Sequence, residues 1–459
     1  MHLPSTYSEA EAYYLSFINL EKTSPSSPEV QRVYRLEPFV EFLELLGNPQ
    51  TQLDCIHIAG TKGKGSTAML LASMLGESGY RVGLFTSPHV RSFRERFQIN
   101  RYPISEADFV RLSRTLAEMV AQNPSPERTG FRTTFELLTA LAFLYFKEQR
   151  TDLVVLETGL GGRLDCTNVV KPIVSIVTAL GFDHTMILGT TLEAIAFEKG
   201  GIIKQGTPVV IARQTQEAEN KVIPVLERLA ADKSAPAFRA WEQWPWERVE
   251  RSLRGQKLRF TPLNRNPLQL EIKLLGDHQG DNLAAALTAI QILDGQGFYC
   301  PDQGLEDGAK KAQWPGRFEI LGNEPIFVLD SAHCPLSFQA LRETLDDLFP
   351  KRTVRLVFGL LGDKEVEAIC SRLHSWTPPP AVHCYTVPSP RATPAGELSR
   401  LLEQHGIKGT PHADVRSALE AAFRSAASDE IVVGAGTIYG LAPLKDAYET
   451  ISQERAQAD

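Results

Sequence analysis

Residues 60–66 combine glycine, lysine and serine in a spacing that suits phosphate binding. They read Gly60-Thr61-Lys62-Gly63-Lys64-Gly65-Ser66, between the apolar run 55–58 and a helical pattern at 67–72. A buried strand, a glycine-rich turn and a helix N-terminus aim several backbone N–H groups and a partial positive charge at one point. We expect Lys64 to reach a β- or γ-phosphate there, and Ser66 to meet the metal ion that accompanies the nucleotide.

The spacing departs from the common Walker pattern. Gly65 separates the lysine from the hydroxyl, and the first glycine lies closer to Lys64 than that pattern requires. The alternative interpretation is a glycine-rich turn at the end of a strand. The strand–turn–helix setting favours a nucleotide site.

A carboxylate stands at the end of a second apolar run. Glu157 follows the run 153–156 and precedes the glycine-rich stretch 158–165, which ends in Asp165. The carboxyl end of a buried parallel strand lies in the crevice where open α/β sheets bind ligands, so Glu157 can hold Mg²⁺ opposite the phosphate loop. A helix cap or a solvated acid is the alternative.

Three further residues could join this chemistry. His184 can supply a neutral metal ligand, and Lys199, flanked by Phe197 and two glycines, is expected to be partly buried with a lowered pKa. Ser87 can offer a second hydroxyl to the metal, although Ser-Pro alone indicates a turn. The charged run 91–96 is either a solvated loop or a flap over a charged substrate.

The second half of the chain places two charged residues where two domains would face a ligand. Arg317 lies in the sequence Trp-Pro-Gly-Arg, and Asp330 follows the first predicted strand of that half. An arginine and an aspartate can bind the phosphate and ribose of a nucleotide. A salt bridge at the junction is an equally ordinary explanation.

The elements that position these residues alternate between strands and helices. Residues up to about 46 have helical spacing, with a Ser/Pro break at 24–28. Unbroken apolar strands separated by amphipathic helices predict a parallel sheet covered on both faces. Strands are expected at 55–58, 81–85, 153–157, 173–177 and 209–212, and helices at 134–146, 191–200, 216–231 and 281–293.

The tryptophan-rich stretch 236–251 interrupts this alternation, and two alternating runs, 257–262 and 268–274, predict a small antiparallel ribbon. The fold class is therefore α/β: a large P-loop-type parallel-sheet ATPase domain with the ribbon, then a smaller Rossmann-like domain. The domain boundaries are 1–301, a linker at 302–315 that is poor in apolar residues, and 316–459. In the last domain we expect strands at 326–329, 354–358, 381–385 and 431–434, with helices at 337–348, 365–374, 395–405 and 415–426.

Composition narrows the class of protein. A chain of 459 residues favours two domains, and a net charge of −7 gives no sign of a nucleic-acid footprint. No apolar run approaches the roughly 20 residues that span a bilayer, and the N-terminus lacks the features of a signal peptide. Six scattered cysteines suit neither a zinc site nor a disulfide framework. We expect a cytoplasmic protein with reduced thiols and with neither nucleic acid nor membrane as partner.

Taken in order, these motifs resemble those of the folylpolyglutamate synthase and dihydrofolate synthase family, which belongs to the Mur-ligase-like ATP-dependent amide ligases. The resemblance covers nearly the whole chain. Its carriers are 60–66, 86–89, 156–168, 183–189, 198–204, 278–282, 314–319 and 330–335. Lys62, Ser331 and Cys334 depart from the commoner residues at their positions, and these departures bear on substrate preference more than on the reaction.

The resemblance implies roles for individual residues. Lys64 and the loop backbone would bind ATP, and two Mg²⁺ ions would be held, one by Ser87 and Glu157 and the other by Glu157 and His184. Lys199 resembles a lysine that CO₂ carbamylates, which turns a cation into an anion that orders a magnesium ion. Asn282, Arg317 and Asp330 match positions at the adenine, phosphate and ribose. The positions expected near the other substrates are Asp165, His333 and Thr437.

The implied reaction transfers the γ-phosphoryl group of ATP to a substrate carboxylate, and the amine of L-glutamate then attacks the acyl phosphate. The acceptor would be a reduced folate and possibly dihydropteroate, and the resemblance suggests a monomer. Two other interpretations stay open: a Mur-type ligase that acts on a cell-wall precursor, and a nucleotide-dependent binding switch.

Overall fold

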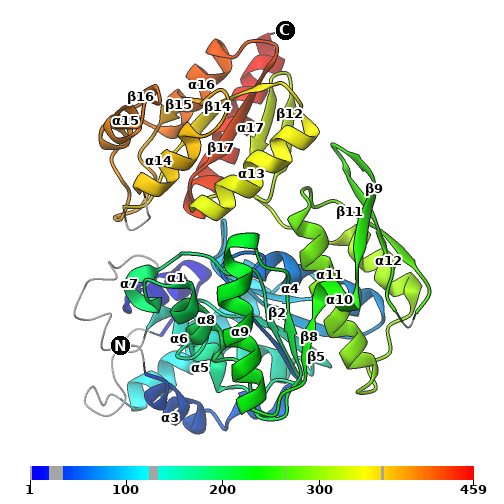
Figure 1. The fold of residues 1–459 in the computed structure, drawn as a ribbon. Coiled ribbons are helices and arrows are strands. Elements are labelled where there is room, and N and C mark those ends of the chain that lie inside the picture. The colour runs from blue at the N-terminus through cyan, green and yellow to red at the C-terminus, as the bar shows by residue number, and fades with distance from the viewer. Residues whose placement is uncertain (1–2, 20–34, 124–132, 264, 363–365, 459) are drawn as a thin grey trace. The chain divides into compact units, whose positions relative to one another are not determined.

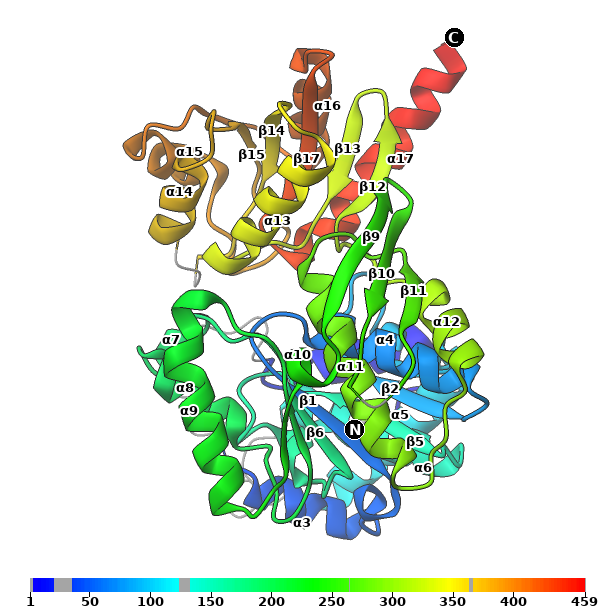
Figure 2. The same ribbon diagram turned by 45° about the vertical axis from the view of Figure 1, so that its right-hand side comes forward.

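The computed structural model describes residues 3–19, 35–123, 133–263, 265–362 and 366–458. Contacts between residues divide the chain into two compact units (Figures 1 and 2). The first comprises Met1–Glu250, Gln256–Lys273 and His278–Gln313, and the second comprises Arg251–Gly255, Leu274–Asp277 and Trp314–Asp459. The second unit therefore takes two short segments from the middle of the chain as well as the C-terminal part.

A mostly parallel sheet organises the first unit. Its strand order is β4-β3-β2-β5-β1-β6-β7-β8, in which β3 pairs antiparallel with β2 and β4 pairs antiparallel with β3. Strand β1 lies in the middle and pairs in parallel with β5 on one side and β6 on the other. The strands are β1 Cys55–Ala59, β2 Val82–Phe85, β3 Phe97–Ile99, β4 Tyr102–Pro103, β5 Leu153–Glu157, β6 Val174–Val177, β7 Val209–Ile211 and β8 Ala237–Arg239.

Helices cover both faces of this sheet. Cys55 and Ala59 of β1 point to the same face, because side chains alternate along a strand. Cys55 belongs to a core cluster with residues of α1, α3, α5 and α6, and Ala59 belongs to a cluster with residues of α8 and α9. Helices α4, α11 and α12 pack together, and α4 contacts β2 and β5. The helices are α1 Tyr7–Leu15, α3 Glu37–Leu45, α4 Lys64–Glu77, α5 Glu106–Gln122, α6 Thr134–Glu148, α7 Thr185–Leu188, α8 Leu192–Gly200, α9 Gln216–Asp232, α10 Ala240–Gln243, α11 His278–Asp294 and α12 Asp302–Lys311, with 3-10 turns η1 Pro49–Gln52, η2 Phe93–Arg96 and η3 Cys166–Val169.

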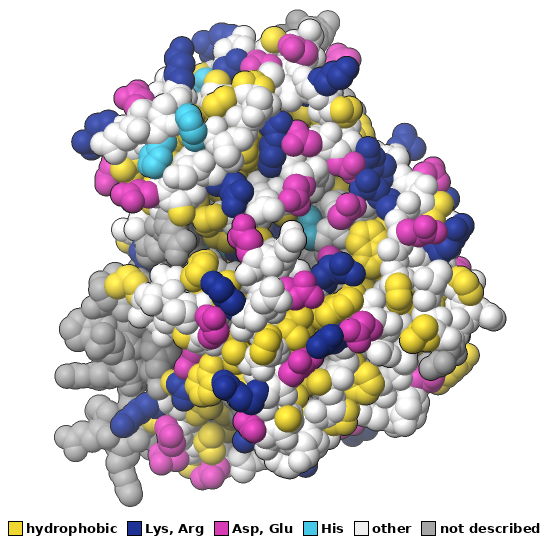
Figure 3. Space-filling view, in the orientation of Figure 1, with side chains coloured by type: hydrophobic (Ala, Val, Ile, Leu, Met, Phe, Trp, Pro, Cys, Tyr) yellow, Lys and Arg dark blue, Asp and Glu magenta, His cyan; other side chains and the backbone are white. Residues whose placement is uncertain are grey.

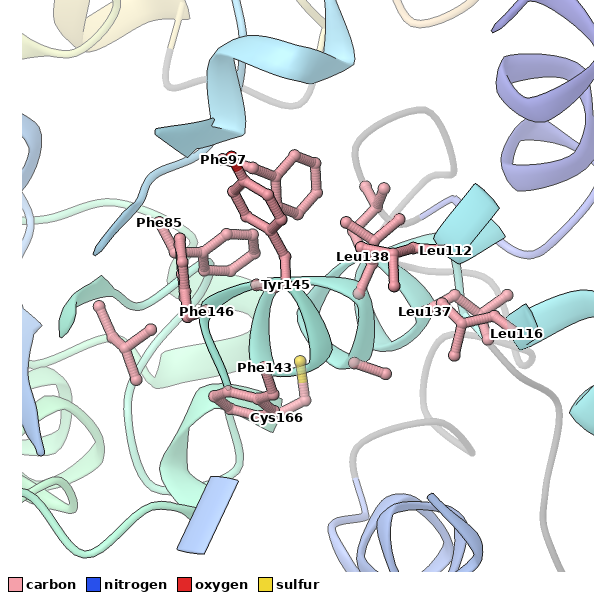
Figure 4. Packing of buried hydrophobic residues seen from close by; sticks show 14 of the residues in the cluster. Phe85, Phe97, Leu112, Leu116, Leu137, Leu138, Phe143, Tyr145, Phe146 and Cys166 are labelled. Carbon is pink, nitrogen blue, oxygen red and sulfur yellow. The ribbon is translucent and has the colours of Figure 1, made fainter. Parts of the chain in front are cut away.

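Helix α6 is the centre of the first unit's aromatic core. It begins at a capping box in which Thr133 accepts from the backbone N–H of Glu136, and its side chains are buried on most sides. In Figure 4, Leu112 and Leu116 of α5 lie beside Leu138 and Leu137 of α6. Burial of this kind stabilises a fold by about 1.5–3 kcal/mol per large apolar side chain. The N-terminal helices α1 and α3 belong to the same core; the Ser/Pro break at 24–28 lies outside the described residues.

The predicted ribbon is a three-stranded sheet in the order β11-β10-β9, with β10 antiparallel to β11. Its strands are β9 Trp246–Ser252, β10 Gly255–Phe260 and β11 Leu268–Ile272. The stretch 236–251, which the sequence analysis treated as an interruption, instead supplies β8 at the edge of the large sheet and β9 of the ribbon. Trp244 and Trp246 contact helix α11, as does the short helix α10, whereas Trp241 packs on the core beside α8 and α9.

The predicted linker at 302–315 is wrong for most of its length. Residues 302–311 form helix α12, which packs on α4 and belongs to the first unit, and that unit ends at Gln313. Two glycines of α12 make this packing possible: a Cβ on Gly308 would lie 2.3 Å from Cα of Met74, and a Cβ on Gly304 would lie 2.5 Å from Oγ of Ser78. The helix therefore buries glycine backbone, and its low apolar content had suggested a linker.

The second unit contains a six-stranded sheet in the order β12-β13-β17-β14-β15-β16, parallel except for β12. This agrees with the predicted Rossmann-like domain, although β12, β16 and the last helix were not foreseen. The elements are β12 Glu319–Asn323, β13 Ile326–Leu329, α13 Pro335–Leu348, β14 Thr353–Phe358, α14 Val366–His374, β15 Ala381–Cys384, α15 Ala395–Gln404, β16 Gly409–Pro411, α16 Val415–Ser425, β17 Glu430–Ala435, η4 Ile438–Gly440 and α17 Leu441–Ala458.

Charges of both signs lie on the surface, and the cysteine thiols are buried. On the face drawn in Figure 3, Lys and Arg side chains are interspersed with Asp and Glu side chains. All six cysteines are buried and free. Among the described helices, none is both long enough and apolar enough to cross a membrane.

Candidate nucleotide and substrate site

The phosphate loop lies where the sequence placed it, between β1 and α4. Gly63 is the N-cap of α4 with φ +87°, a backbone conformation that favours glycine. A Cβ at this position would also lie 2.3 Å from Oδ1 of Asn282. The first intrahelical bond runs from Thr67 N to Gly63 O, so the N–H groups of Lys64, Gly65 and Ser66 have no acceptor within the helix.

The front of the loop is held by contacts with the connection that follows β6. The backbone N–H groups of Thr61 and Lys62 both donate to Ala179 O at 3.0 Å, and the Thr61 hydroxyl donates to Gly181 O at 3.1 Å. The Lys62 ammonium pairs with Asp183 at 3.6 Å. These two residues therefore anchor the loop to the connection between β6 and α7. Direct contact of Thr61 or Lys62 with ATP stays a prediction.

Two lysines, the buried Lys199 and the partly buried Lys64, meet at one carbonyl oxygen. Lys64 Nζ donates to Gly60 O at 3.1 Å, and Lys199 Nζ donates to the same oxygen at 2.9 Å. Burial lowers the pKa of Lys64, although Glu157 acts in the opposite direction. Burial, helped by the charge of Lys64, lowers the pKa of Lys199 to about 7. The predicted partial burial and lowered pKa of Lys199 are confirmed in direction.

Glu157 connects the phosphate loop to a second loop. It ends β5 opposite Ile58 of β1 and is 4% exposed. One carboxylate oxygen lies 3.9 Å from Lys64 Nζ, and the other accepts a hydrogen bond of 3.2 Å from the backbone N–H of Ser87. A carboxylate this deeply buried costs free energy unless a cation accompanies it. Here Lys64 supplies at least part of that charge.

The glycine run after β5 packs on the end of helix α8. A Cβ on Gly162 would lie 2.7 Å from Lys199 O, and a Cβ on Gly201 would lie 2.4 Å from Cβ of Arg163. Glycine at both positions lets the two backbones approach closely. This contact fixes the last turn of α8 and therefore the position of Lys199.

Asp165 is buried beneath this run. Its carboxylate accepts hydrogen bonds from Leu160 N at 2.8 Å, Thr167 N at 3.0 Å and the Thr167 hydroxyl at 2.5 Å. Burial raises its pKa, while these hydrogen bonds act against the rise. In this structure Asp165 caps the turn η3, and its expected contact with substrate stays a prediction.

His184 is held beside an acid to which the sequence analysis assigned no role. It has φ +51° at the start of α7, its backbone N–H donates to Asp183 Oδ1 at 3.1 Å, and its Nε2 lies 3.7 Å from the same oxygen. Asp183 thus contacts both His184 and Lys62. The signal for it was present, because the acid directly precedes the predicted metal ligand.

Side chains of the charged run 91–96 make hydrogen bonds to other residues of the protein. Glu95 accepts hydrogen bonds from the backbone N–H groups of Val90, Arg91 and Ser92. Arg96 is only 1% exposed and donates to His89 Nδ1 at 2.9 Å. The run therefore includes the hydrogen-bonded turn η2, which is joined to Thr86 by a bond from Thr86 N to Arg96 O.

The second unit carries the other predicted site residues. Asp330 accepts hydrogen bonds from the backbone N–H groups of Phe318 and Ala332, both at 2.8 Å, and Arg317 donates to the Ser331 hydroxyl. His333 Nδ1 lies 2.7 Å from Ser331 O. A carbonyl accepts only, so Nδ1 carries the proton and Nε2 is the basic nitrogen.

Thr437 lies on the loop that follows β17. The loop is joined to the Asp330–His333 segment by a 2.8 Å hydrogen bond from Gly436 N to Ala332 O. Thr437 is buried and accepts a hydrogen bond from Tyr439 N at 3.4 Å. Arg317, Asp330, His333 and Thr437 therefore gather around the carboxyl ends of β13 and β17, where α/β sheets bind ligands.

The donor set of the first unit fits magnesium. Mg²⁺ takes oxygen ligands, usually one or two carboxylates together with substrate phosphates. Glu157 supplies the carboxylate, and Ser66 and Ser87 supply hydroxyls on adjoining segments. Within the described ranges, no group of three or more His, Cys, Asp or Glu side chains is placed to hold a metal ion.

A phosphate loop on a large parallel sheet, followed by a second α/β unit, defines a Mur-type ligase. The family model described as the Mur ligase middle domain matches residues 58–290, and the Mur ligase glutamate ligase domain matches residues 316–438. Dihydrofolate synthase/folylpolyglutamate synthase of Bacillus subtilis is 35% identical over 407 residues, which cover 88% of this chain and 93% of the relative. Folylpolyglutamate synthase of Lacticaseibacillus casei is 34% identical and covers 86% and 89%.

Solved structures agree with the sequence comparisons. Mycobacterium tuberculosis folylpolyglutamate synthase complexed with ADP superposes with a TM-score of 0.83 at 28% identity, covering 94% of this chain and 96% of that one. A complex of FPGS with AMPPCP and folate gives a TM-score of 0.80 at 30% identity, covering 95% and 98%. The chain therefore belongs to the folylpolyglutamate synthase and dihydrofolate synthase family of Mur ligases. It is an ATP-dependent ligase that forms carbon–nitrogen bonds.

Proposed function

We propose that this enzyme joins L-glutamate to a reduced folate, and also to dihydropteroate, through an acyl-phosphate intermediate. The named relatives support ATP-dependent glutamate ligation to folate. The observation that carries the proposal is the pair of lysines on Gly60 O, with Glu157 beside Lys64. This arrangement puts fixed positive charge and one carboxylate at the phosphate loop.

The carboxylate of the substrate must be activated before an amine can attack it. An ionised carboxylate is a poor electrophile, and oxide cannot leave from it. In the proposed first step a substrate carboxylate oxygen bonds to the γ-phosphorus of ATP as the bond to the β–γ bridging oxygen breaks, which releases ADP. In the second step the glutamate amine attacks the acyl carbon, phosphate leaves with the bonding electrons, and the nitrogen loses a proton.

The first unit's residues would stabilise charge during phosphoryl transfer. The backbone N–H groups of Lys64, Gly65 and Ser66 and the Lys64 ammonium offset negative charge on the phosphates. We assign Glu157, Ser66 and Ser87 to magnesium ions, with His184 as a further ligand; bound Mg²⁺ would neutralise phosphate charge and orient ATP. Asn282 is assigned to the base.

Lys199 is proposed to carry a carbamate. The reaction of an amine with CO₂ needs the neutral form, and burial lowers the Lys199 pKa to about 7, so a large fraction of this amine is neutral near that pH. The product is an anion at the position where the Lys199 amine nitrogen donates to Gly60 O. Intact-mass measurement with and without bicarbonate tests this: a fully active enzyme with unmodified Lys199 would exclude the carbamate.

In the second unit we assign His333 and Thr437 to glutamate, and Arg317 and Asp330 to phosphate and ribose. His333 Nε2 is left as a proton acceptor because Nδ1 donates to Ser331 O. It is therefore suited to take the proton that the glutamate amine must lose.

One assay tests the proposed function. Purified protein is incubated with ATP, Mg²⁺ and L-glutamate, together with dihydropteroate, a reduced folate or a nucleotide-linked muramyl acid, and ADP release and product mass are measured. We expect glutamate-dependent ADP release with the pteridine acids and a product heavier by one glutamyl residue. Turnover only with the muramyl acid would replace the substrate assignment, and ADP release independent of glutamate would indicate a nucleotide switch.

A further inference from the structure

Two tryptophans hold helix α11 at separate points. The indole N–H of Trp246, at the start of β9, donates to Asp281 Oδ1 at 3.0 Å. The indole N–H of Trp244 donates to Gln291 Oε1 at 2.9 Å. Ten residues separate the two acceptors, about 15 Å along a helix. The Trp246 contact is therefore at the N-terminal turn, and the Trp244 contact is nearly three turns away.

The Trp246 ring also covers the backbone of that first turn. A Cβ on Gly280 would lie 2.5 Å from both Cε2 and Cζ2 of the indole, so only glycine allows the ring to lie there. The Asp281 carboxylate oxygen that accepts from Trp246 lies 3.5 Å from Arg213 Nε as well. Ring packing, a hydrogen bond and an ion pair thus fix the turn from outside.

The same turn carries two buried amides, of which Asn282 lies against the phosphate loop. Gln279 is 1% exposed and Asn282 is 6% exposed, and Asn282 Nδ2 donates to Gln279 Oε1 at 2.9 Å. Asn282 Oδ1 occupies the space that a Cβ on Gly63 would need. A continuous series of contacts therefore runs from Trp246 through Gly280 and the two amides to the loop.

We propose that Trp246 is a positioning residue for the purine base of the nucleotide. The inference rests on the proposed nucleotide site and extends it to the choice of base. A carboxamide can match adenine, which presents a donor and an acceptor side by side, whereas guanine presents two acceptors at the same edge. Such matching requires a fixed carboxamide, and Trp246 fixes the turn on which Gln279 and Asn282 stand.

Nucleotide binding to the full-length protein tests the proposal without relying on turnover. Calorimetric titration with AMPPCP and with GMPPCP, in the presence of Mg²⁺, compares wild type, Trp246→Phe and Trp244→Phe. Both variants keep a ring and lose one indole hydrogen bond to α11. We expect Trp246→Phe to weaken AMPPCP about three- to tenfold, the range for one such bond, and to weaken GMPPCP less. Trp244→Phe should leave both affinities within about twofold.

The acceptor provides a second, independent comparison. Asp281→Asn keeps an oxygen that can accept from the indole, whereas Asp281→Ala does not. We expect the Asn variant to bind AMPPCP like wild type and the Ala variant to resemble Trp246→Phe, with little further loss in the double variant Trp246→Phe/Asp281→Ala. If the melting temperature shows that Trp246→Phe is poorly folded, the comparison of Asp281→Asn with Asp281→Ala tests the positioning role instead.

The outcomes distinguish failure of the proposed nucleotide site from failure of the positioning role of Trp246. A wild-type protein that binds neither analogue contradicts the proposed nucleotide site itself. Binding by wild type together with unchanged affinity and base preference in Trp246→Phe overturns the positioning role alone. An equal loss in Trp244→Phe also overturns it, because the effect would then belong to the whole helix. In steady-state assays of the wild type and Trp246→Phe, the expected change is a raised KM for ATP with kcat and the KM for glutamate unaltered.

Discussion

Lys64 and Lys199 donate to the same backbone oxygen, Gly60 O, at 3.1 and 2.9 Å. Two ammonium groups on one carbonyl, one buried and one partly buried, repel each other, so the pair is most stable when one is neutral. Lys64 has Glu157 as a counter-ion at 3.9 Å, whereas the hydrogen bond of the Lys199 side chain among the described residues is to Gly60 O. Lys199 is therefore the member that gives up its proton.

This relationship predicts how stability depends on pH. The pKa of Lys199 is about 7 in the folded protein and about 10.5 in the unfolded chain, so the unfolded state binds more protons between these values. The free energy of unfolding thus rises with pH across that window as far as Lys199 is concerned. Below pH 7 the full destabilisation that comes from burying this lysine is present. Lys199→Met should stabilise the protein at pH 6 by up to a few kcal/mol, at roughly 1.4 kcal/mol per pKa unit, and by little near pH 10.

Chemical denaturation at several pH values measures this difference. Lys310→Met, which changes an exposed lysine, serves as the control and should give a small difference that does not vary in this way. A Lys199→Met variant whose stability difference is the same at pH 6 and pH 10 would show that Lys199 is not the group that titrates.

Catalysis should depend on Lys64 and Glu157 separately. Lys64→Ala removes the cation at the phosphate loop and leaves Glu157 buried without it, so we expect glutamate-dependent ADP release to fall by about 10²–10³-fold or more. Glu157→Gln keeps the shape and the acceptor for Ser87 N but removes the charge, and a comparable loss is expected. Near-normal turnover in either variant would contradict the proposed phosphate and metal roles.

Glycines at the two ends of helix α4 allow a matched test of the phosphate loop. Gly63 (φ +87°) and Gly79 (φ +101°) both have the left-handed conformation, but only a Cβ at Gly63 meets another atom, Asn282 Oδ1 at 2.3 Å. Each Ala substitution should cost about 1 kcal/mol of backbone strain. Gly63→Ala should in addition abolish ADP-dependent thermal stabilisation, while Gly79→Ala should preserve it.

The contact between α12 and α4 predicts that a substitution in α12 lowers the free energy of unfolding, although this helix has few apolar residues. Gly308→Ala would place Cβ 2.3 Å from Cα of Met74, so we expect a loss of about 1–3 kcal/mol in the free energy of unfolding. Gly396→Ala, at the start of α15 with no atom within 4 Å, should be neutral or slightly stabilising. Equal melting temperatures for Gly308→Ala and wild type would indicate that this packing contributes little.

The sequence predicted the large sheet well because buried parallel strands are continuous apolar runs. Strand β5 ends at Glu157 as expected, and the phosphate loop joins β1 to α4 as its glycines indicated. Helix α12 was missed because half of its buried residues are glycines, Gly304 and Gly308, beside only Leu305 and Ala309, so its apolar signal is weak. Strand β8 was missed because it is short and lies at the sheet edge among prolines and charges.

Side-chain use within the site could be predicted only in part. The burial of Lys199 followed from its apolar and glycine neighbours. The anchoring of Thr61 and Lys62 to Ala179 O and Asp183 did not, because it depends on how two loops from neighbouring strands meet. The sequence marked Trp246 only as part of a tryptophan-rich stretch. Its packing on α11 depends on Gly280, about thirty residues later in the chain.

The division of the chain into units has a consequence for cutting or recombining this protein. Leu275 belongs to the apolar core of the second unit, although it lies 39 positions before Trp314, where the C-terminal part of that unit begins. A fragment that starts at Trp314 would lack this side chain and leave its packing partners open to solvent. A gene fusion or crossover point placed there would separate pieces that fold together, even though it falls between the two matched family regions.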